Sequence, residues 1–270
     1  MRDDAPSDIA PRSGLPFRAL VPNAITALVL CFGLTGVRFA IEGRYEIAII
    51  SIIVAGVLDG LDGRVARLLK AQSRFGAELD SLADNIAFGV SPALVVFLWS
   101  LSEAPRFGWI ASLALAVCCA LRLARFNARI DNDDQPHKSA GFLTGVPAPT
   151  GAGLAFVPLY LWIITGEGLF REWWLVMPWV LFVALLMISS VATYSWSSVR
   201  VRREWRLFAL VGVGLLGAAL LTMTEEALLL ISILYLACLP FSMASYRRVK
   251  QRRRAGRASP SETAPSPTAP

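Results

Sequence analysis

The chain has 270 residues, of which 55% are hydrophobic and 17% are charged, and its formal net charge is +6. A soluble globular domain is usually about 45–50% apolar and about 25% charged. This composition argues against an ordinary soluble domain, and the long apolar runs between short polar stretches indicate a membrane protein. Because the basic residues lie beside apolar runs, the positive charge favours contact with lipid and argues against nucleic-acid binding.

In chain order, residues 1–20 mix charges with prolines and show no cleavable signal peptide, so we predict a cytoplasmic N-terminal segment. Eight apolar segments follow, each near the ~20 residues that a bilayer core requires. They cover residues 21–40, 46–66, 80–100, 107–127, 146–166, 173–193, 206–223 and 226–245. We therefore predict an all-α, polytopic membrane helical bundle of about eight transmembrane helices, with residues 21–245 as one transmembrane catalytic domain.

Residues 246–270 are predicted to form a basic stretch against anionic lipid, followed from about Ala255 by a disordered cytoplasmic tail rich in Ser, Pro, Thr and Ala. The four cysteines lie in apolar runs without metal-ligand spacing, which is typical of small buried side chains.

Lysine and arginine are concentrated in alternate connections between the apolar segments. The connection after the second segment carries Arg67, Lys70 and Arg74, and both ends of the chain carry further arginines, whereas the other connections are mainly acidic. Positively charged connections stay on the cytoplasmic side. The pattern therefore predicts a multi-pass protein of the cell membrane, which we expect to be a bacterial inner membrane, with both termini in the cytoplasm.

The segment Val57–Pro92 carries four aspartates, Asp59, Asp62, Asp80 and Asp84, near or inside apolar runs. A charge at the centre of a membrane helix costs about 2.5–3.5 kcal/mol on insertion scales. Four unpaired carboxylates therefore require compensation. The alternative, that these acids lie at loop ends and face water, is disfavoured by their spacing.

That spacing places the acids on two helix faces. One face combines Asp59 and Asp62 with three residues at helical spacing, Gly63, Ala66 and Arg67. The next face carries Gly76, Asp80 and Asp84, each four residues from the last. The basic turn Leu68–Phe75 joins the two helices, so they can pack antiparallel and bring the carboxylates together.

Carboxylates so close to one another require cations between them. Ligation by oxygen alone suits Mg²⁺, Mn²⁺ or Ca²⁺ rather than zinc. We predict a divalent metal site, with two metal ions as the economical arrangement. The small residues permit either close helix packing or a bound substrate. Arg67 suits a phosphate, because its planar guanidinium binds two oxygens at once.

The pattern Asp59-x2-Asp62-Gly63-x2-Ala66-Arg67-x8-Gly76-x3-Asp80-x3-Asp84 resembles the signature of the CDP-alcohol phosphatidyltransferases. Three further stretches resemble the phosphatidylserine synthase branch of that family. They are Pro22-Asn23-Ala24-Ile25-Thr26, Leu121-Arg122-Leu123-Ala124-Arg125-Phe126-Asn127 and Gly145-Val146-Pro147. Together the resemblance spans roughly the first 150 residues.

The resemblance implies transfer of the phosphatidyl group from CDP-diacylglycerol to the hydroxyl of L-serine, with release of CMP. It implies that Asp59, Asp62, Asp80 and Asp84 bind metal, Mg²⁺ or Mn²⁺, and that Asp84 is the general base. The CDP-diacylglycerol contacts that it implies are Asn23, Thr26, Asp62, Gly63, Ala66, Arg67, Ser73 and Gly76. It also implies a homodimer, with the active site facing the cytoplasm.

The serine contacts are predicted from chemistry at the cytoplasmic end of the fourth apolar segment. Arg122, Arg125 and Asn127 lie there, and an arginine can bind the serine carboxylate, although both arginines also fit a role as positive-inside anchors. His137, the single histidine, lies in a charged loop that favours a solvated role.

Three alternatives stay open at this point. The acceptor can be another alcohol, such as glycerol 3-phosphate, an inositol compound or choline. The acids can form the ion site of a divalent-cation transporter, although nearby arginines disfavour a cation path. A purely structural membrane protein leaves four intramembrane acids unexplained.

Overall fold

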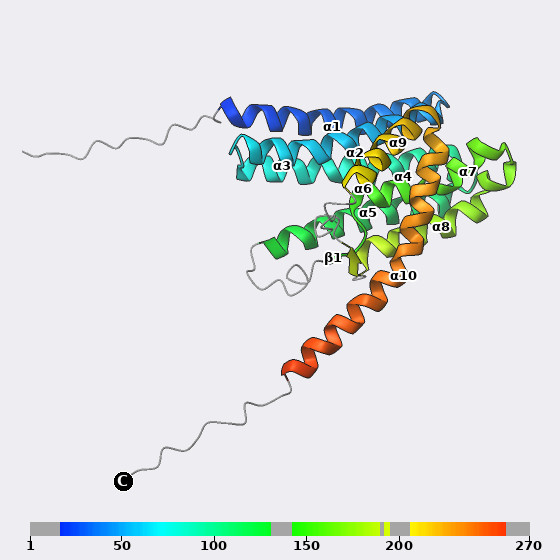
Figure 1. Ribbon diagram of the computed structural model, residues 1–270. Helices are drawn as coiled ribbons and strands as arrows, with labels where there is room; N and C mark the ends of the chain where they lie inside the picture. Colours follow the sequence, from blue (N-terminus) through cyan, green and yellow to red (C-terminus); the bar gives the residue numbers. More distant parts are fainter. Residues whose placement is uncertain (1–16, 131–141, 190–191, 195–205, 258–270) are drawn as a thin grey trace, which may run out of the picture.

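The computed structural model describes residues 17–130, 142–189, 192–194 and 206–257, and this part of the chain is almost entirely helical (Figure 1). The α-helices are α1 (Phe17–Ile41), α2 (Tyr45–Leu68), α3 (Arg74–Asn85), α4 (Ser91–Trp99), α5 (Pro105–Ile130), α6 (Ala148–Ala155), α7 (Val157–Thr165), α8 (Trp173–Ile188), α9 (Arg206–Thr222) and α10 (Thr224–Arg257). A π-helical segment, η1 (Ile86–Val90), and two 3₁₀ segments, η2 (Leu101–Glu103) and η4 (Gly168–Arg171), connect some of them.

A short strand pair is the only β-structure in the described residues. Strand β1 (Phe142–Thr144) pairs antiparallel with β2 (Ala192–Tyr194), with Phe142 opposite Tyr194. The pair ties the chain after α5 to the chain after α8. The charged loop with His137 and the far end of the predicted tail lie outside the described residues.

Each of the eight apolar segments is mainly helical in the described residues, which confirms the predicted all-α class. Five helices are long and apolar enough to cross a membrane: 20–41, 74–99, 105–128, 148–165 and 224–241. The α8 helix and residues 210–222 of α9 are shorter apolar helices. Helix α2 is absent from the five, and it is the helix that carries Asp59 and Asp62, as expected where intramembrane charges serve a function. The number of spans and the side of the termini stay predictions.

Several helices differ in extent from the predicted segments. The helix predicted at 173–193 ends at Ile188, and residues 192–193 lie in strand β2. The segment predicted from residue 80 begins at Arg74 and passes through η1 just before Pro92, whose ring and missing N–H do not fit a regular α-helical turn. The segment at 146–166 is divided between α6 and α7, with Pro158 near the break. Helix α10 continues beyond residue 245 through the basic stretch to Arg257.

Helix α1 organises the part of the bundle that contains the acids. It packs along α2 and against α3, α4 and η1, and α2 and α3 each contact α1 more closely than they contact each other. Figure 1 shows α1, α2 and α3 as neighbouring rods. Gly33 allows the close approach, because a Cβ there would lie 2.7 Å from the Cα of Ala87 in η1. Because α2 and α3 pack on α1 and scarcely touch each other, a space remains between them beside α1.

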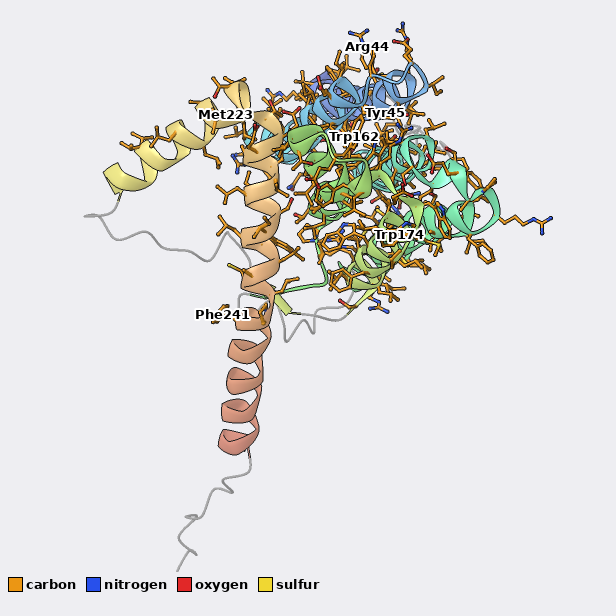
Figure 2. All side chains as sticks on the ribbon, turned by 90° about the vertical axis from the view of Figure 1, so that its right-hand side faces the viewer. Arg44, Tyr45, Trp162, Trp174, Met223 and Phe241 are labelled. Carbon is orange, nitrogen blue, oxygen red and sulfur yellow. The ribbon has the colours of Figure 1, made fainter. Side chains whose placement is uncertain are left out.

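The remaining helices complete the core. Helix α5 packs against α8, and α7 packs against α10. The largest fully buried side chains include Trp99, Tyr160 and Phe88. In Figure 2, α9 diverges from the main body, and α10 runs along that body and then extends past it.

Candidate active site

The turn between α2 and α3 is shorter than predicted, because Arg74 and Phe75 already belong to α3. Lys70 has a left-handed backbone with φ of 50°. The Lys70 N–H donates to the Arg67 carbonyl at 3.2 Å, and the Ala71 N–H donates to the Ala66 carbonyl at 2.9 Å. This is a Schellman motif, which satisfies the last carbonyls of α2 and reverses the chain within a few residues.

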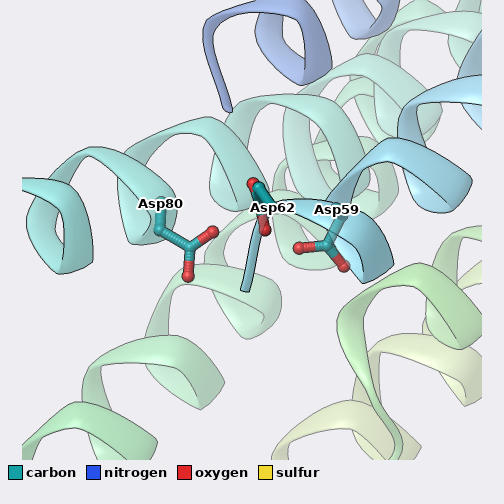
Figure 3. A group of neighbouring side chains, drawn as sticks. All are labelled: Asp59, Asp62 and Asp80. Carbon is teal, nitrogen blue, oxygen red and sulfur yellow. The ribbon is translucent and has the colours of Figure 1, made fainter. Parts of the chain in front are cut away.

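Three carboxyl groups meet in the space between α2 and α3. One oxygen from each of Asp59, Asp62 and Asp80 lies within 4.8 Å of the other two. Figure 3 shows Asp59 and Asp62 on one helix and Asp80 on the next, with their carboxyl groups gathered in one region. Asp62 is only 5% exposed. The structure therefore brings together acids that lie about twenty residues apart in the sequence.

Asp84 lies one turn beyond Asp80 on α3 and joins the cluster through Asp59. The carboxyl groups of Asp59 and Asp84 lie close enough to interact directly. The other Asp84 oxygen, Oδ1, is buried and has no hydrogen-bond partner in the described part of the chain. Asp84 therefore adjoins the acidic cluster, and its buried Oδ1 is available to a ligand.

The donor set of this cluster fits a divalent cation. All four side chains offer carboxylate oxygen, which Mg²⁺, Mn²⁺ and Ca²⁺ prefer. Among the described residues, the ion pairs join Glu42 to Arg38 and Arg44, and none reaches the four aspartates. Repulsion between the carboxylates is therefore not relieved by a direct ion pair in this part of the chain. Asp59, Asp62 and Asp80 could bind a metal ion, whose identity the geometry leaves open.

A cavity of about 320 Å³ opens beside the acids, between α1, α2 and α3. Seven of the eight residues predicted to contact the nucleotide donor line it, namely Asn23, Thr26, Asp62, Gly63, Ala66, Ser73 and Gly76. A Cβ at Gly63 would meet no atom within 4 Å, so this glycine leaves open space. A Cβ at Gly76 would lie 3.0 Å from Asn23 Oδ1, so Gly76 instead allows α1 and α3 to approach.

Arg67 and Ser73 have local roles that the sequence did not reveal. Arg67 is exposed, is not part of the cavity lining, and donates through Nε to the Gly63 carbonyl at 3.1 Å. Ser73 is the N-cap of α3, and its hydroxyl accepts the Gly76 N–H at 3.0 Å. Ser73 thus stabilises the start of the helix that carries Asp80.

The three predicted serine contacts have different surroundings. Arg122 is partly buried and interacts electrostatically with Asp84, although the two do not form a direct ion pair in the described part of the chain. Arg125 is exposed, and its Nη1 donates to the Ile188 carbonyl at 3.0 Å. Asn127 donates to Ser81 Oγ at 2.8 Å. Arg122 thus interacts electrostatically with an aspartate of the site, whereas Arg125 and Asn127 bond α5 to neighbouring helices.

Several residues of the site were not predicted from the sequence. Pro22, Ala71, Gln72 and Ala77 also line the cavity, and Ser81 anchors Asn127. Ala77 and Ser81 follow Ser73 at intervals of four residues, so helical spacing could have identified them. No local pattern marks Gln72, which lies in the turn.

Comparison with known proteins supports the family that the aspartate motif suggested. Residues 19–191 match the sequence pattern that defines the CDP-alcohol phosphatidyltransferases. The chain belongs to this family. Residues 204–240 also match a second pattern, CDP-alcohol phosphatidyltransferase 2.

Similar proteins agree in their names. A Mycobacterium tuberculosis CDP-diacylglycerol–serine O-phosphatidyltransferase is 40% identical over 232 residues, which cover 86% of this chain and 81% of that protein. The Mycobacterium leprae protein of the same name is 39% identical over 84% of this chain and 76% of its own length. A Helicobacter pylori protein of that name is 37% identical over 53% of this chain and 58% of its own length.

Proposed function

We propose that this membrane enzyme transfers the phosphatidyl group of CDP-diacylglycerol to the hydroxyl of L-serine, giving phosphatidylserine and CMP. The observation that carries the proposal is the meeting of Asp59, Asp62 and Asp80 within 4.8 Å beside a cavity lined by the motif's small residues. Family membership supports the type of reaction, and the names of the similar proteins support serine as the acceptor.

In this proposal, CDP-diacylglycerol binds with its nucleotide in the cavity and its pyrophosphate toward the acids. Gly63 and Ala66 give the nucleotide room, because a larger side chain at either position would project into the cavity. Asn23 approaches Gly76 from α1 and closes one wall. Arg67 lies exposed near the end of α2, where it can reach a phosphate after leaving the Gly63 carbonyl.

Asp59, Asp62, Asp80 and Asp84 would hold the divalent metal, Mg²⁺ or Mn²⁺, in a site for two ions. Bound there, the metal would neutralise pyrophosphate charge and stabilise the attacking and leaving oxygens. Asp84 takes the proton of the serine hydroxyl as that oxygen forms its bond to phosphorus and the bond from phosphorus to CMP breaks. Its unpartnered Oδ1 supports this role as general base.

Arg122 is the strongest candidate to bind the serine carboxylate. Its Nε is buried without a hydrogen-bond partner in the described residues, and it interacts with Asp84 without pairing directly. A carboxylate between them would satisfy the guanidinium and leave the serine hydroxyl near Asp84. Arg125 and Asn127 complete this region at the end of α5.

We further infer a cytoplasmic active site in the cell membrane, which in a bacterium is the inner membrane. The basic connection between α2 and α3 supports this orientation, because basic connections stay in the cytoplasm. A homodimer, the one-domain organisation of residues 21–245 and a disordered tail remain predictions. Membership of a transferase family removes the main support for a transporter or a purely structural protein.

The decisive experiment follows CMP release by purified protein supplied with CDP-diacylglycerol, L-serine and Mg²⁺ or Mn²⁺. We expect serine-dependent CMP release that chelation abolishes and that added metal restores. A parallel panel replaces serine with glycerol 3-phosphate, inositol compounds and choline. CMP release with one of these, and none with serine, would overturn the acceptor but preserve the reaction type.

A second experiment tests the assignment of Arg122. We expect Arg122→Gln to raise the KM for serine about tenfold or more, while the KM for CDP-diacylglycerol changes little, because a charge-assisted contact is worth about 1.5–3 kcal/mol. Arg125→Gln is the matched variant on the same helix. If Arg125→Gln alone raised the serine KM, Arg122 would have a structural role instead.

A further inference from the structure

The hydroxyl of Thr26 on α1 lies within hydrogen-bonding distance of two acceptors. Its Oγ1 is 2.8 Å from Asp62 Oδ2 and 3.1 Å from the carbonyl oxygen of Pro22, one turn back on the same helix. Thr26 is 4% exposed and Asp62 is 5% exposed, so water has little access to this contact. The bond to Asp62 joins residues 36 positions apart and links α1 to α2 at the acidic cluster.

A threonine hydroxyl has one proton, so the two acceptors compete for it. Bonding to the carbonyl four residues back is the usual local choice for threonine in a helix. The carboxylate is the stronger acceptor and is also the nearer one. Thr26 therefore donates to Asp62 Oδ2, which restricts the rotamer of a carboxyl group in the acidic cluster.

We propose that Thr26 is a positioning residue for the metal site, which holds Asp62 in the orientation that binds the cation. The inference rests on the proposed metal-dependent function. It assigns the Thr26 hydroxyl a role different from nucleotide contact, although Thr26 also lines the donor cavity. Groups that orient a metal ligand commonly change metal affinity or activity by about 10–100-fold when they are removed.

The two roles predict different kinetics for Thr26→Val, which keeps the shape of the side chain and removes the donor. A positioning role raises the metal concentration needed for half-maximal activity about tenfold or more. The KM for CDP-diacylglycerol, measured at saturating metal, then stays near the parent value. A nucleotide contact would raise that KM and leave the metal requirement unchanged.

Matched variants separate this role from a general effect on α1. Thr26→Ser keeps the hydroxyl and is expected to restore the parent metal affinity. Thr35 lies on the same helix, and its hydroxyl donates to the Cys31 carbonyl at 2.6 Å and to no carboxylate in the described part of the chain. Thr35→Val removes the same type of local bond and should leave the metal requirement unchanged.

Mn²⁺ binding to purified protein without substrate, followed by electron paramagnetic resonance, gives a readout independent of the reaction. We expect Thr26→Val to weaken Mn²⁺ binding about tenfold or more, and Thr26→Ser and Thr35→Val to bind like the parent. Equal Mn²⁺ affinity for Thr26→Val and the parent would overturn the inference, even if the enzyme makes phosphatidylserine. If the parent protein itself did not bind Mn²⁺, the proposed metal site would be overturned instead.

Discussion

Two groups of glycines in this bundle have different surroundings, although both lie in apolar helices. On α1, a Cβ at Gly33 would lie 2.7 Å from the Ala87 Cα, and one at Gly36 would lie 2.9 Å from a side-chain carbon of Ile52. On α2, a Cβ at Gly60 or Gly63 would meet no atom within 4 Å. The first pair permits helices to touch, and the second pair borders unfilled space.

This difference separates packing from binding. Small residues on membrane helices commonly allow close helix contact. The α1 glycines follow that rule, and their contacts bring η1 and α2 against α1. Gly63 does not follow it, because it faces the donor cavity beside Asp62. Substitutions on the α1 side should therefore reduce stability, and substitutions in the cavity should reduce activity.

The largest expected effect is a loss of activity when one acid of the cluster between α2 and α3 is replaced. Asp80→Asn removes one of the three converging carboxylates, so we expect CMP release to fall at least about a hundredfold. Thermal stability should not fall, because the change relieves repulsion between acids. Glu78→Gln, an exposed change on the same helix, is the control and should retain parent activity. Unfolding of Asp80→Asn would show that the acids serve packing.

The next effect is on stability, from the packed α1 face. Gly33→Ala would force α1 away from η1, and overpacking of this kind costs about 1–3 kcal/mol. We expect a lower melting temperature in detergent. Gly212→Ala on α9 adds the same methyl group where no atom lies within 4 Å, and it should not lower the melting temperature. Equal behaviour of the two variants would contradict the close contact at Gly33.

A smaller effect is expected from filling the cavity. Gly63→Leu should raise the KM for CDP-diacylglycerol about tenfold, since one misfit in a pocket is worth about 1–3 kcal/mol. The melting temperature should not fall, because leucine is the better helix former. Gly60→Leu places the same side chain one turn earlier, outside the cavity lining, and should leave that KM unchanged. A lower melting temperature for Gly63→Leu alone would indicate packing at this position.

The smallest effect concerns the cap of α3. Ser73→Ala removes the acceptor of the Gly76 N–H, which should cost about 1 kcal/mol of stability. Ser73→Thr keeps a hydroxyl cap and should melt close to the parent. A changed KM for CDP-diacylglycerol with an unchanged melting temperature would instead identify Ser73 as a phosphate contact.

The sequence predicted much of the site because helical spacing is a local property. Asp59 and Asp62 share a face, as do Gly76, Asp80 and Asp84, wherever those segments form helices. Seven of the eight donor contacts that the family resemblance implied line the cavity. The roles of these residues in binding and catalysis stay predictions.

The sequence was less informative about polar partners from distant segments. The resemblance implied that Thr26 contacts the donor, and Thr26 does line the cavity, but nothing in the sequence indicated that its hydroxyl donates to Asp62. It grouped Arg122 with Arg125 and Asn127, yet Arg122 interacts electrostatically with Asp84, whereas the other two bond to Ile188 and Ser81. These partners lie on other helices, so spacing within one helix does not indicate them.

By itself, the sequence determined the helical class, the family and the faces on which the acids lie, because apolar runs and residue spacing depend only on neighbours in the chain. The tertiary structure decided which small residues touch another helix and which border a cavity. It also decided that α1 holds α2 and α3 at the distance where three carboxylates meet. The physical reason is that contacts between helices depend on side chains from both partners, and Gly33 and Gly63 differ only in what lies opposite them.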